Sequence, residues 1–219
     1  IKPIVPTERG VFLPTTYRMA PALCRFISDA VYDGRLEAES NNANQKLALG
    51  ATADPALAEA GIRFVPVDHQ GNAQQSAEEA GRVACLIESL LKQDFVDRDG
   101  VRRRITLEDI LVVAPYNLQV HLLRQTLPSG ARVGTVDKFQ GQEAAVAIVS
   151  MATSSQEDLP RNIGFLFSKN RLNVAISRAR CLALVVASPK LLTVHCATVE
   201  QMALVNLLCW IAREKINHH

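Results

Sequence analysis

The sequence lacks several signatures of self-contained active sites. None of its seven lysines follows a glycine, so the phosphate-binding loop G-x-x-x-x-G-K-[ST] does not occur. The patterns G-x-G-x-x-G and H-E-x-x-H are also missing, and no Ser-His-Asp or Cys-His arrangement is recognisable. These absences exclude a cradle for nucleotide phosphates built by this chain alone, and they leave no obvious nucleophile.

Cysteine pairs, long apolar runs and an initiator methionine are missing as well. The five cysteines are odd in number and scattered, with no C-x-x-C pair, which favours reduced, buried thiols over disulfides or structural zinc. No apolar run approaches membrane-spanning length and no signal peptide is recognisable, so we expect a cytoplasmic protein without a membrane partner. We also expect the chain to be part of a longer protein, with a tail at 216–219 that is disordered or tag-derived.

What the sequence has is a regular alternation of apolar runs and amphipathic stretches. With 219 residues and 48% hydrophobic content, it predicts one domain over 1–219. Short, fully apolar runs predict buried strands, and longer amphipathic stretches predict the helices between them. The strands are expected at 62–68, 109–115, 131–136, 144–152 and 181–188, and helices at 76–93, 117–127 and 198–215. This order predicts an α/β fold, a three-layer sandwich with a mostly parallel sheet.

The helix at 76–93 has the clearest start signal. Ser76 followed by Glu79 is a capping-box pattern, in which each side chain bonds the backbone of the other residue. Behind it, apolar residues recur at helical spacing and predict a buried face. These residues are Val83, Leu86, Ile87, Leu90 and Leu91.

Two stretches fall outside the alternation. Residues 36–61 are polar and rich in small side chains, and predict an irregular surface insertion. Residues 97–106 contain an Asp-Gly turn signal followed by Arg102, Arg103 and Arg104, and predict a hairpin. We favour a solvent-exposed hairpin there, with a nucleic-acid contact as the alternative.

The charge is unevenly distributed although the net charge is only +2. Residues 36–100 hold eleven acidic and five basic residues, whereas residues 159–199 hold no acidic residue and six basic ones. Such a one-sign segment is typical of a polyanion site, and equally of a basic surface without a ligand. Charge alone leaves both interpretations open.

The basic segment includes RLNVAISRAR, residues 171–180, which reads as a helix with an apolar stripe. Arg171, Val174 and Arg178 fall on one side by helical spacing, so both arginines would project together. A helix C-terminal arginine that interacts with the helix dipole is the structural alternative, and Arg180 fits that role better because it lies nearer the end.

Four segments of the sequence resemble motifs of one family, and they occur in the family's order. TTYRMAPAL, VVAPYNLQV, VGTVDKFQGQEAAVAIVS and NRLNVAISRAR are similar to motifs of the second RecA-like domain of superfamily 1 helicases. The branch is that of the nonsense-mediated-decay RNA helicases and the Okazaki-fragment nuclease-helicases. The resemblance implies a RecA-like, P-loop NTPase-like fold that lacks its own P-loop.

By this resemblance, six residues face a nucleotide. Tyr17 would stack on the base and Arg18 would reach the terminal phosphate, tasks that suit a planar ring and a guanidinium fork. Arg178 matches the arginine finger that neutralises charge on a transferring phosphoryl group. In QGQE, the residues that would face the nucleotide are Gln140, Gly141 and Glu143. Glu143 would meet ribose or water. The alternative for QGQE is a polar loop before the next strand.

Nucleic-acid contacts are expected at the opposite edge of the domain. The residues that match the family motifs have short polar side chains at the ends of predicted elements. Such side chains can bind a phosphate backbone without reading the base sequence. They are Asn117, Thr135, Asp137 and Asn173. Phe139 is placed in the core in preference to a base-stacking role.

The resemblance also implies partners for this chain. ATP with Mg²⁺ would be held mainly by a preceding RecA-like domain of the same parent, with no metal site in this chain, so we expect the isolated fragment to be inactive. Single-stranded nucleic acid is the expected polymer partner, with DNA placed ahead of RNA. The alternative function is a stand-alone nucleic-acid-binding or interaction module with a helicase-like fold and no ATPase activity.

Overall fold

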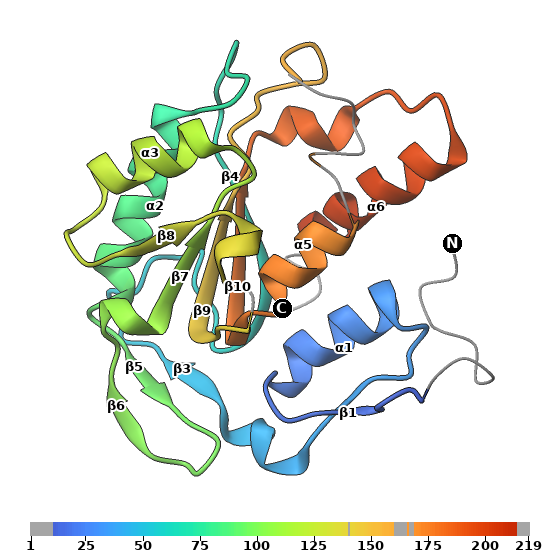
Figure 1. Cartoon of the computed structure of the whole chain (residues 1–219). Helices are drawn as coiled ribbons and strands as arrows, with labels where there is room; N and C mark the ends of the chain where they lie inside the picture. The colour runs from blue at the N-terminus through green and yellow to red at the C-terminus, as the bar shows by residue number, and fades with distance from the viewer. Residues whose placement is uncertain (1–10, 140, 160–165, 167–168, 214–219) are drawn as a thin grey trace.

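A parallel sheet of five strands lies at the centre of the computed structural model, which describes residues 11–139, 141–159, 166 and 169–213 (Figure 1). The strand order is β4-β10-β9-β7-β8, and every neighbouring pair in it runs parallel. The strands are β4 (Gly61–Pro66), β7 (Ile110–Val113), β8 (Arg132–Gly134), β9 (Ala144–Ser150) and β10 (Ala179–Ala187). Each overlaps an apolar run that predicted a strand.

Helices cover both faces of this sheet and complete a three-layer sandwich. Successive side chains of a strand point to opposite faces, so Leu111 and Val113 enter one core while Ile110 and Val112 enter the other. The first core contains α1 (Pro21–Val31), α5 (Lys169–Ile176) and α6 (Val199–Arg213), and the second contains α2 (Ala77–Leu90) and α3 (Asn117–Thr126). The predicted α/β class and its RecA-like layering are confirmed.

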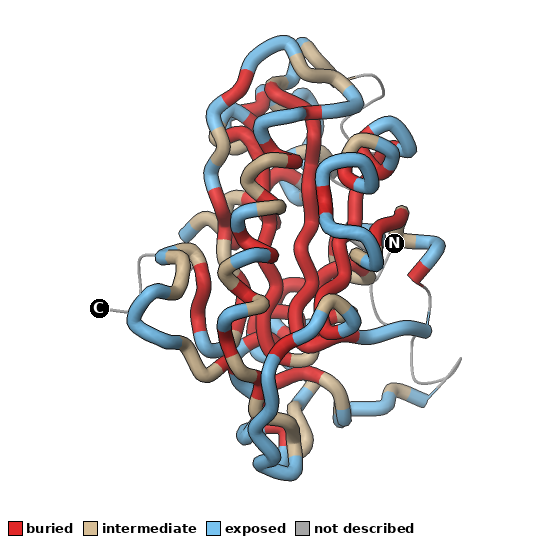
Figure 2. The backbone as a smooth tube through the Cα atoms, turned by 90° about the vertical axis from the view of Figure 1, so that its left-hand side faces the viewer, coloured by how far each residue is buried: buried red, intermediate tan, exposed pale blue. Residues whose placement is uncertain are grey.

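The central strands β9 and β10 are buried along nearly their whole length, as Figure 2 shows for the middle of the molecule. Both lie between two neighbouring strands and under helices on both faces, which is why their sequences read as continuous apolar runs. This rigid centre fixes the positions of the residues that precede and follow the two strands.

Helix α2 begins at the predicted cap but uses only half of the capping box. The Ser76 side chain accepts a hydrogen bond from the backbone N–H of Glu79. The backbone N–H of Ser76 instead donates to Oε1 of Gln119, at 2.8 Å, and the Glu79 carboxylate points into the core. The reciprocal bond predicted by the capping pattern is therefore absent.

Helix α5 ends earlier than its sequence predicts. It stops at Ile176, a turn follows at 177–178, and Arg180 lies in β10. The backbone carbonyl of Arg178 accepts from the N–H of Ala144, and that of Arg180 accepts from the N–H of Ala20. Hydrogen bonds to the sheet and to the start of α1 replace those of a longer helix.

Smaller elements pack around the central sheet. An antiparallel sheet has the order β3-β5-β6, and a parallel pair joins β1 and β2. Their bounds are β1 (Thr15–Thr16), β2 (Glu37–Ala38), β3 (Lys46–Ala48), β5 (Asp94–Val96) and β6 (Arg102–Arg104). The 3-10 helices are η1 (Ser40–Asn44), η2 (Leu107–Asp109), η3 (Val136–Phe139) and η4 (Pro189–Thr193).

The two segments outside the predicted alternation both have regular structure. Segment 36–61, expected to be irregular, contains β2, η1 and β3, and the side chain of Leu47 in β3 is fully buried. The predicted hairpin corresponds to β5 and β6, joined by residues 97–101 with Gly100 at a φ of 81°. Pairing of β3 with β5 orders the insertion, a contact that local composition does not reveal.

Within the described residues, none of the helices has both the length and the apolar character that crossing a bilayer requires.

Candidate functional site

Three segments far apart in the sequence meet at the amino ends of β9 and β10, which we call the amino edge. Glu143 immediately precedes β9, and its carboxylate lies between two guanidinium groups. Arg18 donates from Nε to its Oε2 at 2.8 Å, and Nε of Arg180 lies 3.5 Å from its Oε1 without hydrogen-bond geometry. Arg18 also donates from Nη1 to the backbone oxygen of Ser177, at 3.1 Å.

Arg178 lies at the same edge, in the turn between α5 and β10. Its Nε donates to the carbonyl of Val174 at 3.1 Å, and its Nη1 donates to the carbonyl of Gln142 at 3.3 Å. Partial burial lowers the pKa of Arg178, and the positive charge of Arg18 lowers it further. Arg178, and not Arg180, therefore bonds the last turn of α5. Arg18 and Arg178 place two positive charges at an edge that is partly shielded from water.

The other predicted nucleotide residues lie beside these in the chain. Tyr17, next to Arg18, is a 66% exposed residue. Gly141 is exposed and adopts a φ of 80°, a left-handed conformation that glycine adopts without strain. Gln140 lies outside the described residues. Sequence reasoning named Arg18, Glu143 and Arg178, and the structure brings these three together.

The predicted nucleic-acid residues lie mainly at the opposite end of the sheet, which we call the carboxyl edge. Asn117 begins α3 just after β7, while Thr135 and Asp137 follow β8, the strand beside β7. Asn117 and Asp137 are exposed and Thr135 is half-buried. Asn173, on α5, is half-buried, and its Oδ1 has no hydrogen-bond partner among the described residues.

The two edges are separated by the length of the central strands. Seven residues of β9 at about 3.3 Å each place them roughly 20 Å apart. A pocket opens at the carboxyl edge between the ends of β7 and β9 and helix α5, with Thr135 and Arg171 among its lining residues. The amino edge therefore holds the arginine cluster, and the carboxyl edge holds exposed polar groups and a pocket.

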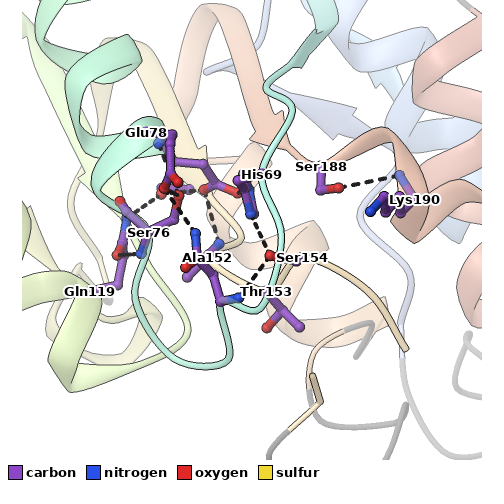
Figure 3. Close-up of polar contacts among 12 residues, drawn as sticks. His69, Ser76, Glu78, Gln119, Ala152, Thr153, Ser154, Ser188 and Lys190 are labelled. Atoms are coloured by element: carbon purple, nitrogen blue, oxygen red, sulfur yellow. Dashed lines mark hydrogen bonds and ion pairs between the residues drawn. The ribbon is translucent and has the colours of Figure 1, made fainter. Parts of the chain in front are cut away.

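A buried polar network lies under the carboxyl edge, and the sequence analysis missed it (Figure 3). The side chain of Glu79 has no solvent exposure, yet its carboxylate bonds three groups. It accepts from Oγ of Ser150 at 2.6 Å and from the N–H of Ala152 at 2.9 Å, and Nε2 of His69 lies 3.0 Å away. The only signal in the sequence was Glu79 itself, which the capping pattern explained differently.

The network joins four segments of the chain. Nδ1 of His69 contacts Oγ of Ser154 at 2.7 Å, which ties the end of β4 to the segment after β9. Gln119 donates from Nε2 to Oγ of Ser150 at 2.9 Å, which ties in α3 two residues after Asn117. We interpret the network as the support that holds the carboxyl edge in place.

The arginines of the hairpin are balanced by carboxylates. Asp94 pairs with both Arg102, at 2.8 Å, and Arg104, at 3.4 Å. Arg103 donates to both oxygens of Asp109, at 2.6 and 2.7 Å. These ion pairs account for the hairpin arginines without a nucleic-acid ligand.

No group of three or more His, Cys, Asp or Glu side chains is arranged to hold a metal ion in the part of the chain that the structure describes. The five cysteines are free, but only Cys24 and Cys181 are buried, whereas Cys85 is exposed. The expectation of buried thiols is therefore wrong for the other cysteines, because apolar neighbours in the sequence do not specify which side of its segment each cysteine occupies.

Comparisons with known proteins place this chain in a family. Residues 5–190 match the family model described as an AAA domain. DNA-binding protein SMUBP-2 of Rattus norvegicus is 35% identical over 77% of this chain and 17% of its own length. DNA polymerase alpha-associated DNA helicase A of Schizosaccharomyces pombe is 33% identical over 77% of this chain and 26% of its own length.

A third relative matches a shorter region. Putative helicase mov-10-B.1 of Danio rerio is 41% identical over 41% of this chain and 10% of its own length. The chain thus spans about a quarter or less of each of these relatives. The match over 186 residues, together with the RecA-like layers and the ordered motifs, shows that the chain belongs to the AAA-domain family of superfamily 1 helicases.

Proposed function

We propose that this chain is the C-terminal motor domain of an ATP-dependent superfamily 1 helicase. ATP would bind between the amino edge and a preceding RecA-like domain of the parent protein. One observation carries the proposal: Arg18 meets Glu143, 125 residues away, and Ser177, 159 residues away, at the edge that also holds Arg178. A purely structural ion pair would not require a second, partly buried arginine at the same place.

The proposed roles follow from the charges at this edge. Arg178 neutralises charge that develops on the γ-phosphoryl group, and Arg18 contacts the terminal phosphate. Glu143 balances Arg18 in the structure, and their side chains are 42% and 31% exposed. An ion pair this exposed contributes about 1 kcal/mol or less, so a phosphate can replace the carboxylate as the partner of Arg18. Glu143 is then released to meet ribose or water.

Tyr17, Gln140 and Gly141 complete the nucleotide side. The exposed ring of Tyr17 is available to stack on a base without prior unfolding. Mg²⁺ and most phosphate contacts would come from the preceding domain, because this chain has no phosphate loop. The isolated chain would accordingly bind ATP weakly and hydrolyse none.

We propose contacts with a single strand through Asn117, Thr135 and Asp137 at the carboxyl edge, and through Asn173 on α5. The first three lie about 20 Å from the amino edge, which allows nucleotide and strand to bind at the same time. The two relatives above that cover 77% of the chain have DNA in their names, while "Probable RNA helicase armi" of Drosophila melanogaster covers 42%. We therefore place single-stranded DNA ahead of RNA, in a cytoplasmic protein.

The test is Arg178→Ala in the full-length parent. Turnover of ATP should fall about a thousandfold or more, with little change in ATP binding, because a finger acts on the transition state. Arg25→Ala is the matched control, since Arg25 is an exposed arginine on α1 and should leave turnover unchanged. Unchanged turnover in the Arg178 variant would refute the assignment.

A further inference from the structure

A basic cleft of about 450 Å³ lies beside β8. This strand is the edge strand of the central sheet (Figure 1). The walls of the cleft come from the end of α3, the turn at 128–131 and η3. Three cationic side chains line it, and no Asp or Glu does. These cations are Arg124, Arg132 and Lys138.

The three cations are held by neutral acceptors. Arg124 donates to the carbonyl of Val133 at 3.1 Å, and Nζ of Lys138 donates to the same carbonyl at 3.3 Å. Arg132 donates to the carbonyl of Glu108 at 2.6 Å and to Oε1 of Gln142 at 2.7 Å. These bonds bring Arg124 and Lys138 to one shared carbonyl and fix Arg132 separately, without neutralising any of the three charges.

The nearby hairpin shows the opposite arrangement. Arg102 and Arg104 share Asp94, and Arg103 has both oxygens of Asp109. In the described residues no ion pair involves the cations of the cleft. Positive charge is thus concentrated in the cleft and balanced on the hairpin, which is the pattern expected where a polyanion supplies the missing negative charge.

The cleft runs along the outer edge of β8, from η3, beside the proposed nucleic-acid residues, to the turn at 128–131 that precedes this strand. Lys138 belongs to the same short helix as Asp137, and its N–H donates to the carbonyl of Thr135 at 3.1 Å. Phe139, the aromatic residue lining the cleft, is only 3% exposed, so the cleft offers charge and no platform for stacking bases. Phosphates, and not bases, match this surface.

We propose that the basic cleft binds the phosphate backbone of a single strand that leaves the carboxyl edge beside η3 and continues along the outer edge of β8. This inference rests on the proposed function, because it extends the path of the same strand. Contacts made only to phosphates position a strand and do not read its sequence. The cleft therefore adds affinity that depends on salt and not on base identity.

The test uses the full-length parent carrying Arg124→Ala with Lys138→Ala, and a fluorescent oligo(dT) strand as the probe. Affinity is measured between about 50 and 200 mM salt, and each lost phosphate contact should lower the slope of log K against log salt by about 0.7. The double variant should lower it by about 1.4. Both side chains are exposed, so the fold should persist.

Two further variants make the result specific. Arg102→Ala with Arg104→Ala removes the same charge from the paired hairpin and should leave the slope unchanged. Arg124→Lys with Lys138→Arg keeps both charges in the cleft and should restore the wild-type slope. A poly-glutamate peptide serves as the competing ligand, and its binding should not change in the cleft variant.

Equal slopes for the wild type and the cleft variant would overturn the inference and leave the proposed function intact. A cleft variant that loses poly-glutamate binding but keeps the strand slope would overturn it in favour of an acidic protein partner. A wild-type parent that does not bind the strand at all would instead overturn the proposed function.

Discussion

At the residue scale, Glu143 is the counter-charge of the amino edge. It holds Arg18 by a direct hydrogen bond and Arg180 by a longer ion pair. Arg178, by contrast, bonds only carbonyl oxygens among the described residues, so its positive charge has no direct partner. An arginine oriented by neutral acceptors suits a role in which an incoming phosphate supplies the negative charge.

A different ion pair at the residue scale has a predictable pH dependence. Arg82 donates to both oxygens of Asp54, at 2.5 and 2.7 Å, and these bonds lower the pKa of the carboxyl. Because the pKa is lower in the folded state, the pair stabilises the fold above the ordinary pKa of about 3.9 and loses this effect as pH falls through the folded value.

Substitution of Asp54 should reveal this pH dependence. The difference in free energy of unfolding between wild type and Asp54→Asn, measured by urea titration, should be constant from about pH 7 to pH 5 and shrink below about pH 4. In an Arg82→Met background the same substitution should give a much weaker pH dependence. A difference that stays constant down to the acid limit would contradict the account.

The identities of the candidate residues were largely predictable, but their contacts were not. The sequence motifs predicted Arg18, Glu143 and Arg178 as candidates, because each matches a residue of a superfamily 1 helicase motif. That Arg180 would share Glu143 depends on α5 ending at Ile176, which places Arg180 in β10. A contact between residues this far apart is set by the sheet and not by local spacing.

At the scale of elements, the buried network connects α2, α3, β4 and β9. Ala152, just after β9, has a φ of 68°, which costs a non-glycine residue of the order of 1 kcal/mol or more. Its N–H donates to Glu79, so the network helps to hold the strained turn. The carboxyl edge thus depends on one carboxylate of α2.

Removing that carboxylate should be costly. Glu79→Ala leaves His69 and Ser150 buried without their partner and should lower the free energy of unfolding by about 3 kcal/mol or more, measured by urea titration. Glu88→Ala, on the exposed face of the same helix, should change it by about 0.5 kcal/mol or less. Equal effects of the two substitutions would show that the network does not support the fold.

Element types were easier to predict than element ends. The three inner strands β7, β9 and β10 are almost entirely apolar, a pattern that burial on both faces of a parallel sheet requires. The order in segment 36–61 was not visible, because β3 forms only by pairing with β5, almost fifty residues away. The same holds for Glu79, whose buried role depends on three other segments.

At the scale of the whole molecule, the described arginines of the basic segment 159–199 do not form one patch. Arg171 lines the pocket at the carboxyl edge, whereas Arg178 and Arg180 lie at the amino edge. Helix α5 runs between these two edges along one face of the sheet. The described arginines of the acid-free segment therefore lie at two separate edges, a division that neither interpretation drawn from charge alone had specified.

The central claim is that ATP binds against the amino edge, and photolabelling tests it most directly. The full-length parent is irradiated with 8-azido-ATP and the labelled peptide is mapped by mass spectrometry. Because the exposed ring of Tyr17 is proposed to stack on the base, the label should map to residues 15–20 and be lost in Tyr17→Ala. Label at Asn117 or Thr135, or none within this chain, would contradict the claim.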